Sequence, residues 1–300
     1  MNMSLEPKKR LSVHLFSGLL LASIFNLQLL AGSLVPASAP SLTNVAGAGG
    51  SFLPVLSADG RYVAFVSQAN NLAVETTSSM YLDVFVRDLL TGTATLVSVN
   101  TSGSGGGRGN STSPSISADG RWVAFESEAP DLVTNDFNKL SDVFVRDLLS
   151  GTTWLVSINA SGAVSGSSDI FVRQNFPGSY HPAISADGRW TVFESDNYDL
   201  NTNDRNHVID VYVLDLQTGT TEWISAGAQT IYKYGNQAFG SSHSAAPTPD
   251  ARRVAFVSTA ANLLPGLTNL LGEIYVRDLP ANVTYWASTN LTNFPAFANG

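Results

Sequence analysis

The chain has 300 residues, a formal net charge of −8 at pH 7 and no cysteine. It is long enough to bury a large hydrophobic core, and without cysteine it has no disulfide to stabilise that core. The acidic charge, with Lys and Arg scattered after the N-terminus, excludes nucleic acid and anionic lipid as partners.

The N-terminus has the order of a secretory signal peptide: a basic start, an apolar run and small residues. Lys8, Lys9 and Arg10 precede an apolar run over residues 11–35, and Ala-Ser-Ala follows. Cleavage is expected after that triplet or, because Pro40 disfavours it there, near Gly32; an uncleaved anchor is the alternative. We predict a signal peptide over residues 1–40, a periplasmic or secreted protein, and no membrane span after cleavage.

A short lead-in over residues 41–51 is followed by a unit that occurs four times. Each unit contains a version of SADGRWVAFES and, further on, a version of DVFVRDL. The predicted repeats cover residues 52–112, 113–180, 181–243 and 244–288, and their anchor aspartates are Asp59, Asp119, Asp187 and Asp250.

Each repeat predicts four short strands. In the second repeat they are residues 115–117, 122–127, 142–148 and 153–158, which are rich in Val, Ile, Phe, Trp and Thr. Asp119-Gly120 and Gly151 mark tight turns between them. Tight turns between consecutive strands give an antiparallel meander, and a meander must pack against copies of itself to bury both faces.

The pair of motifs S-A-D-G-R-x-V-A-F and D-V-[FY]-V-x-D-L resembles the WD-like repeats of TolB-type β-propellers, over residues 52–288. The resemblance implies an all-β fold, a β-propeller of four-stranded antiparallel blades, with four repeats forming an incomplete ring. Ala251 replaces the turn glycine in the fourth repeat, and Leu214 replaces an arginine in the third. The repeats exceed the roughly 40–45 residues of a compact blade because two loops in each are long.

Segments rich in Gly and Ser separate the repeats, and we expect them to lie as linkers on one face. The second linker contains Asp169-Ile-Phe-Val-Arg-Gln174, which is either an extra edge strand, the favoured interpretation, or a fragment of a blade. Residues 289–300 resemble the start of a fifth, truncated repeat.

A calcium site is predicted in the loop between the second and third strands of two repeats. Both loops have the pattern D-x-N-x-x-x-D, and oxygen ligands at this spacing suit Ca²⁺. An Asx-turn, in which these side chains bond their own backbone, is the alternative. The candidate ligands are Asp136, Asn138, Asp142, Asp204, Asn206 and Asp210, with Asp131 and Asp199 as further oxygen donors.

Other polar residues recur with the repeat and have structural interpretations. The anchor aspartates are expected to form turns. The arginines that follow them, Arg61, Arg121, Arg189 and Arg252, are expected to pair with Asp88, Asp147, Asp215 and Asp278. His181 and His243 near the innermost strands are expected to be surface or capping residues rather than metal ligands. Trp122, Trp190, Trp154, Trp223 and Trp286 are expected to pack between blades rather than to bind sugar.

The chain has no G-x-S-x-G motif and no cysteine nucleophile, so we predict that it is not an enzyme. The family resemblance implies an exported, non-catalytic propeller that binds a protein or glycan of the cell envelope. No cofactor is predicted except Ca²⁺ in the loops named above. The alternative is a metal-dependent polysaccharide lyase or hydrolase that uses the propeller channel.

Overall fold

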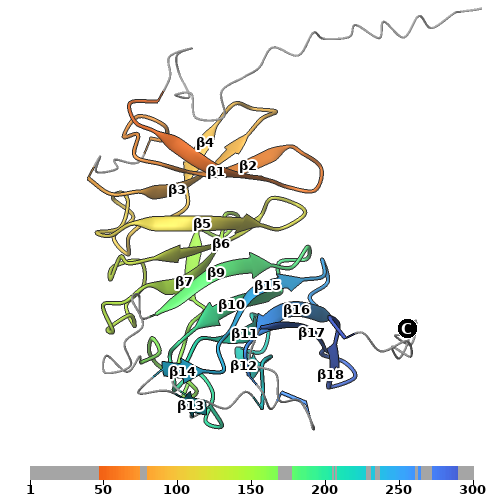
Figure 1. The fold of residues 1–300 in the computed structure, drawn as a ribbon. Coiled ribbons are helices and arrows are strands. Elements are labelled where there is room, and N and C mark those ends of the chain that lie inside the picture. The colour runs from red at the N-terminus through yellow and green to blue at the C-terminus, as the bar shows by residue number, and fades with distance from the viewer. Residues whose placement is uncertain are drawn as a thin grey trace, which may run out of the picture. The chain divides into compact units, whose positions relative to one another are not determined.

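A computed structural model describes residues 47–74, 80–167, 178–204, 206, 208–227, 231–233, 237–260, 263–264 and 272–289 (Figure 1). All of them belong to one compact unit, Pro36–Gly300. The predicted signal peptide, the possible strand at Asp169 and nearly all of the predicted fifth repeat lie outside the described residues. No helix is found among the described residues, and hence none there that could cross a membrane.

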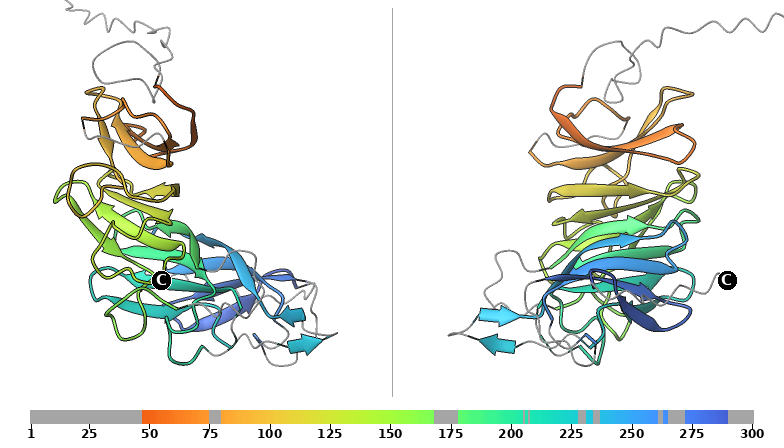
Figure 2. Two further views of the ribbon diagram at one scale, coloured as in Figure 1. Left: turned by 90° about the vertical axis from the view of Figure 1, so that its left-hand side faces the viewer. Right: turned by 45° about the vertical axis from the view of Figure 1, so that its right-hand side comes forward.

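The described strands form four antiparallel four-stranded sheets, in which each strand pairs with its neighbours in sequence (Figures 1 and 2). The prediction of an all-β fold made of four-stranded blades is therefore confirmed. Blade 1 contains β1 (Ser51–Leu56), β2 (Tyr62–Ser67), β3 (Asp83–Asp88) and β4 (Ala94–Leu96). Blade 2 contains β5 (Ser111–Ile116), β6 (Trp122–Ser127), β7 (Asp142–Asp147) and β8 (Thr152–Leu155). Blade 3 contains β9 (Ser179–Ile184), β10 (Trp190–Ser195), β11 (Asp210–Asp215) and β12 (Thr220–Trp223). Blade 4 contains β15 (Ser242–Pro247), β16 (Arg253–Ser258), β17 (Glu273–Asp278) and β18 (Val283–Trp286). A separate hairpin pairs β13 (Ile231–Lys233) with β14 (Gln237–Phe239).

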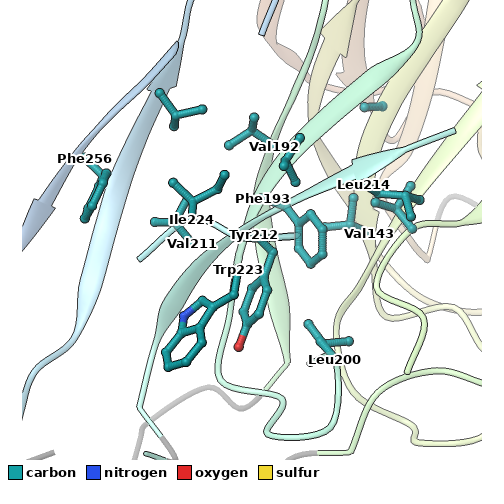
Figure 3. Packing of buried hydrophobic residues seen from close by; sticks show 14 of the residues in the cluster. Val143, Val192, Phe193, Leu200, Val211, Tyr212, Leu214, Trp223, Ile224 and Phe256 are labelled. Carbon is teal, nitrogen blue, oxygen red and sulfur yellow. The ribbon is translucent and has the colours of Figure 1, made fainter. Parts of the chain in front are cut away.

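Apolar residues on both faces of the second and third strands form the core. Val84 and Val86 of blade 1 pack in one cluster with Phe125 and Phe144 of blade 2. A larger cluster joins blades 2, 3 and 4, and Figure 3 shows part of it. Because each sheet is covered by the next one, its central strands are apolar on both faces rather than alternating.

The first strand of every blade contains a β-bulge. The strand register shifts there, and one residue in each blade has a φ of 51–57°, which is unusual for residues other than glycine. These residues are Leu53, Ser113, His181 and Ser244. The bulge extends the first strand beyond the sequence prediction: in blade 2 it begins at Ser111 rather than at residue 115.

The turn between the first and second strands links neighbouring blades. In blade 3, Ser185 donates to Asp187 Oδ1 at 2.5 Å, and the carboxylate accepts the backbone N–H of Arg189 at 3.0 Å. Equivalent bonds occur in the other three blades, so the anchor aspartates are turn residues as predicted. Gly188, with a φ of 75°, leaves room for the ring of Trp122 of blade 2; a Cβ there would lie 2.1 Å from that ring.

Two of the predicted linkers contain ordered turns that the sequence analysis missed. In the first, the side chain of Asn100 accepts the backbone N–H of Ser104 at 3.1 Å, and the chain then returns to bridge Val99 with Gly106. In the second, Asn159 accepts the N–H of Ala163 at 3.3 Å in the same way. The shared pattern is Asn-x-Ser-Gly, in which the glycine takes a positive φ of about 70° that turns the chain back.

Candidate functional site

The acidic loop of blade 2 is held by the strand that follows it. Asp136 and Asn138 lie between β6 and β7, and Asp142 is the first residue of β7. Ser157 donates its hydroxyl to Asp142 Oδ1 at 2.5 Å and accepts the backbone N–H of Val143 at 3.1 Å. A serine fifteen residues after the aspartate also donates to it in blades 1 and 3. These serines were not predicted from the sequence, although their constant spacing from the aspartate is a detectable signal.

Two oxygens of the blade 2 loop are buried without a hydrogen-bond partner. Asn138 bonds to the main chain at both ends: its Oδ1 accepts the N–H of Leu140 at 2.8 Å and its Nδ2 donates to the carbonyl of Gly166 at 2.8 Å. Asp136 is 5% exposed and Asp142 is 0% exposed. Asp136 Oδ1 and Asp142 Oδ2 nevertheless have no hydrogen-bond partner. This loop therefore combines an Asx-turn with two unsatisfied carboxylate oxygens.

The corresponding loop of blade 3 is satisfied by its own donors. The Tyr212 hydroxyl donates to Asp204 Oδ2, and Asn206 Nδ2 donates to Asp210 Oδ2 at 2.6 Å. Asn206 Oδ1 accepts the N–H of Val208 at 3.0 Å, which is again an Asx-turn. Asp204 Oδ1 accepts the N–H of Asn206 at 3.1 Å. The sequence pattern is the same in the two loops, but the hydrogen bonding is different.

Burial changes the ionisation of these carboxyl groups. It raises the pKa of Asp142 to about 8 and that of Asp210 to about 8. Burial also raises the pKa of Asp136, against a hydrogen bond from Ser165. In blade 1, which has no first aspartate in this loop, burial raises the pKa of Asp83 to about 6. Each pKa rises because a buried carboxylate loses its hydration and the neutral acid loses much less.

Asp131 and Asp199, predicted as further calcium ligands, each accept a hydrogen bond that fastens the loop to the preceding linker. Asp131 Oδ1 accepts the backbone N–H of Arg108 at 2.9 Å, and Asp199 Oδ1 accepts that of Ser167 at 2.7 Å. Among the described residues, no three His, Asp or Glu side chains come together in a group that could hold a metal ion. Calcium binding by the two loops stays a prediction.

A second polar cluster lies where the first strand of one blade meets the second strands of blades 2 and 3. His181 is the bulge residue of β9, its side chain is 68% exposed, and its Nδ1 lies 3.1 Å from Glu194 Oε2. That hydrogen bond raises the pKa of His181 and, against burial, lowers the pKa of Glu194. Glu126 Oε2 accepts the N–H of His181 at 2.9 Å, and Glu194 Oε1 accepts that of Ala245 at 3.1 Å. Each glutamate thus ties its blade to the next one, which is a structural use of its oxygens.

Three of the four predicted Arg–Asp pairs are confirmed. Arg61, Arg121 and Arg189 each make two hydrogen bonds to the carboxylate of Asp88, Asp147 and Asp215, at 2.6–3.1 Å. Each guanidinium also lies 4.7–4.8 Å above the ring of the next residue. The bonds from arginine lower the pKa of all three aspartates.

The fourth pair differs from the prediction. Asp278 pairs with Arg253 rather than Arg252, with Arg253 Nε 2.9 Å from Asp278 Oδ2. The reason is the strand register: Arg253 stands directly opposite Asp278, at the position that Trp190 occupies opposite Asp215.

In the fourth strands, Trp223 and Trp286 stand at matched places, whereas Trp154 does not. Trp154 pairs with Val145, whereas Trp223 pairs with Tyr212, so the two indoles leave opposite faces of their sheets. Trp154 is 38% exposed, and its ring lies 5.5 Å from that of Trp122. Trp223 is buried and donates to Ser225 at 3.1 Å. Packing within and between blades accounts for these rings.

An open groove of about 400 Å³ lies between blades 1 and 2. Its walls come from β2–β4 on one side and from the two turns of blade 2 on the other. Thr95 of this groove stands at the strand position of Trp154. The groove between blades 1 and 2 is lined by Tyr62, Val86, Asp88, Thr93, Thr95, Asp119, Gly120, Arg121, Leu148 and Leu149.

No family model and no curated protein matches the chain. Similar solved structures include TolB from Acinetobacter baumannii, with 16% identity over 79% of this chain and 43% of that chain, and a TM-score of 0.43. The β-propeller domain of the Trilobed protease from Pyrococcus furiosus has 12% identity over 81% of this chain and 73% of that chain (TM-score 0.36). A puromycin-hydrolysing peptidase from Mycobacterium tuberculosis has 12% identity over 84% of this chain and 31% of that chain (TM-score 0.44). These likenesses concern the fold alone, and the chain spans less than half of the TolB structure.

Proposed function

We propose that this protein is an exported, non-catalytic β-propeller that binds another protein of the cell envelope. The observation that carries the proposal is a pair of exposed leucines at the same turn of neighbouring blades. Leu90 is 76% exposed at the β3–β4 turn, and Leu149 is 77% exposed at the β7–β8 turn. Leu149 also lines the groove between blades 1 and 2.

Folding does not require leucine at this turn. The backbone N–H of Leu90, of Leu149 and of Gln217 in blade 3 donates to the preceding aspartate at 2.9 Å in each case. The bond is made by the main chain, and glutamine serves equally well in blade 3. A leucine side chain that becomes buried against a partner contributes roughly 1.5–3 kcal/mol to binding. Two such side chains, one of which lines an open groove, are therefore suited to a protein partner.

The proposed location rests on the N-terminal sequence. A basic start, an apolar run and small residues direct export, so the mature protein would act in the periplasm or outside the cell. Expression of the full chain in a Gram-negative host should give an extracytoplasmic product shortened by about 30–40 residues. A full-length cytoplasmic product would contradict the proposal of export.

The partner is tested by affinity capture from an envelope extract, with quantitative mass spectrometry. The wild-type protein is compared with a double variant, Leu90→Gln with Leu149→Gln, which copies the blade 3 turn. A control carries Leu56→Gln and Val283→Gln, two apolar residues exposed elsewhere. A protein enriched by wild type and control but at least about tenfold less by the double variant supports the proposal, as the loss of two buried leucines implies. Equal enrichment by all three contradicts it. Metal-dependent cleavage of a polysaccharide that is lost in His181→Ala would instead favour an enzyme.

A further inference from the structure

The blade 2 loop contains two buried carboxylate groups, each with one oxygen that accepts no hydrogen bond. Asp136 Oδ1 and Asp142 Oδ2 are buried and have no hydrogen-bond partner. Asp136 and Asp142 belong to the same loop, and each affects the pKa of the other, which places the two carboxylates close together. Neither makes an ion pair with a described Lys, Arg or His side chain. A buried carboxylate without a partner costs several kcal/mol, so a positive species is expected between the two.

Blade 3 shows how the same loop is closed without an ion. There the two corresponding oxygens accept hydrogen bonds from the Tyr212 hydroxyl and the Asn206 amide. The position of Tyr212 in β11 is that of Phe144 in β7, two residues after the strand's first aspartate. Both rings stack on a phenylalanine of the second strand, Phe144 at 5.7 Å and Tyr212 at 5.8 Å. Figure 3 shows Tyr212 beside its partner Phe193. Blade 2 therefore has the same ring in the same place but lacks the hydroxyl group.

The asparagine side chains of the two loops also have different hydrogen-bond partners. Asn206 directs its amide nitrogen to Asp210, whereas Asn138 directs its amide nitrogen to the Gly166 carbonyl. Of the two donors that neutralise the blade 3 carboxylates, the hydroxyl is absent from blade 2. The Asn138 amide donates to Gly166; it also lowers the pKa of Asp142, but Asp142 Oδ2 keeps no hydrogen-bond partner.

We propose that Asp136 Oδ1 and Asp142 Oδ2 of blade 2 bind a single Ca²⁺ ion, and that Tyr212 and Asn206 close the equivalent space in blade 3. Carboxylate oxygens are ligands that Ca²⁺ prefers, and backbone carbonyls and water would complete its shell of six to eight oxygens. With two charged ligands, a Kd of about 10⁻⁴ to 10⁻³ M is expected, as for extracellular calcium modules. The sequence predicts a calcium site in the loops of both blades, whereas only the loop of blade 2 is proposed to bind the ion.

The test is equilibrium dialysis of the purified protein against ⁴⁵Ca²⁺ at pH 7.5. The wild-type protein should bind one ion per chain. Phe144→Tyr supplies the missing hydroxyl and should lower the affinity at least tenfold. Tyr212→Phe is the matched control, because it changes the same ring position of blade 3 by one oxygen; Asp210 keeps its Asn206 donor, so binding should remain one ion per chain.

Asp136→Asn is the second variant, needed in case Phe144→Tyr does not fold; it removes one charged ligand with little change of volume and should also lower the affinity at least tenfold. Thermal unfolding of each variant in chelator establishes that it is folded. No binding by the wild-type protein up to about 10 mM Ca²⁺, ten times the weakest expected Kd, would overturn the proposal and leave a shared proton between the two carboxylates. Two ions per chain, or one ion whose affinity is unchanged in a folded Phe144→Tyr and in Asp136→Asn, would also overturn it.

Discussion

Asp83 should make the stability of this protein fall as the pH rises from about 4 to 6. It is the first residue of β3 and is 1% exposed. Its Oδ1 accepts the hydroxyl of Ser98 at 2.6 Å, and Gly106 packs so closely that a Cβ there would lie 2.5 Å from Oδ1. Burial raises the pKa of Asp83 from the usual 3.8 to about 6 in the folded protein.

The direction of the effect follows from which state holds the proton more tightly. Between these two pKa values the unfolded chain has lost the proton and the folded protein keeps it, so stability declines with rising pH. The contribution is complete below the unfolded pKa and is lost as the pH passes the folded pKa. A shift of about two units corresponds to roughly 3 kcal/mol of unfolding free energy.

Asp83→Asn removes this titration while keeping an oxygen that accepts the Ser98 hydroxyl. Urea unfolding of the wild-type protein and the variant at pH 4.5, 5.5, 6.5 and 7.5 gives the difference in unfolding free energy at each pH. That difference should shift in favour of the variant by about 2 kcal/mol across the series, because the series begins above the unfolded pKa. Asp88→Asn is the control: arginine lowers the pKa of Asp88, so its difference should be nearly constant over this range. A constant difference for Asp83→Asn would refute the reasoning.

Two further predictions concern the contacts between and within blades. Gly188→Ala should lower the unfolding free energy by about 2 kcal/mol or more in urea unfolding, because a Cβ would lie 2.1 Å from the Trp122 ring at a φ of 75°; Ala251→Gly, at the equivalent turn with a φ of 53°, should raise it by up to about 1 kcal/mol. A loss at both positions would contradict this account of the turn. Arg253→Ala should cost roughly 1–3 kcal/mol because it leaves Asp278 without its ion pair, whereas Arg252→Ala should change the unfolding free energy by less than about 0.5 kcal/mol; the reverse order would restore the pairing expected from sequence.

Most of the architecture was predictable because each strand and turn is specified four times. The SADG corner predicts a turn from its Asp-Gly pair, and the structure confirms it with Asp187 as a hydrogen-bond acceptor and Gly188 at a positive φ. The Arg–Asp pairs were predictable in three blades, since their spacing is nearly constant. In blade 4 the spacing predicted the wrong arginine, because Arg252 and Arg253 are adjacent. Only the register of β16 against β17 decides which of the two faces Asp278.

The details of the candidate site were less predictable because they depend on single atoms. Phe144 and Tyr212 are both aromatic residues of an apolar strand, and the sequence pattern treats them alike. Only the folded structure shows that the Tyr212 hydroxyl ends on Asp204. Likewise, the first strands were predicted too short because the bulge at Ser113 interrupts the alternation of side chains.

Because one chain contains four copies of the blade, equivalent positions can be compared within it to distinguish residues that the fold requires from residues that it does not. Positions with the same residue in every copy have contacts that explain it, as the corner aspartates do. At positions where the residue differs between blades while the backbone stays the same, the fold does not require a particular side chain. Thr95 is such a position: in blade 2 its counterpart Trp154 packs beside Trp122, whereas Thr95 and Tyr62 line an open groove. Thr95→Trp should therefore fill the groove, leave the unfolding free energy unchanged or slightly higher, and abolish capture of any partner that occupies it. Capture by this variant at the wild-type level, with the fold intact, would place the binding surface elsewhere on the propeller.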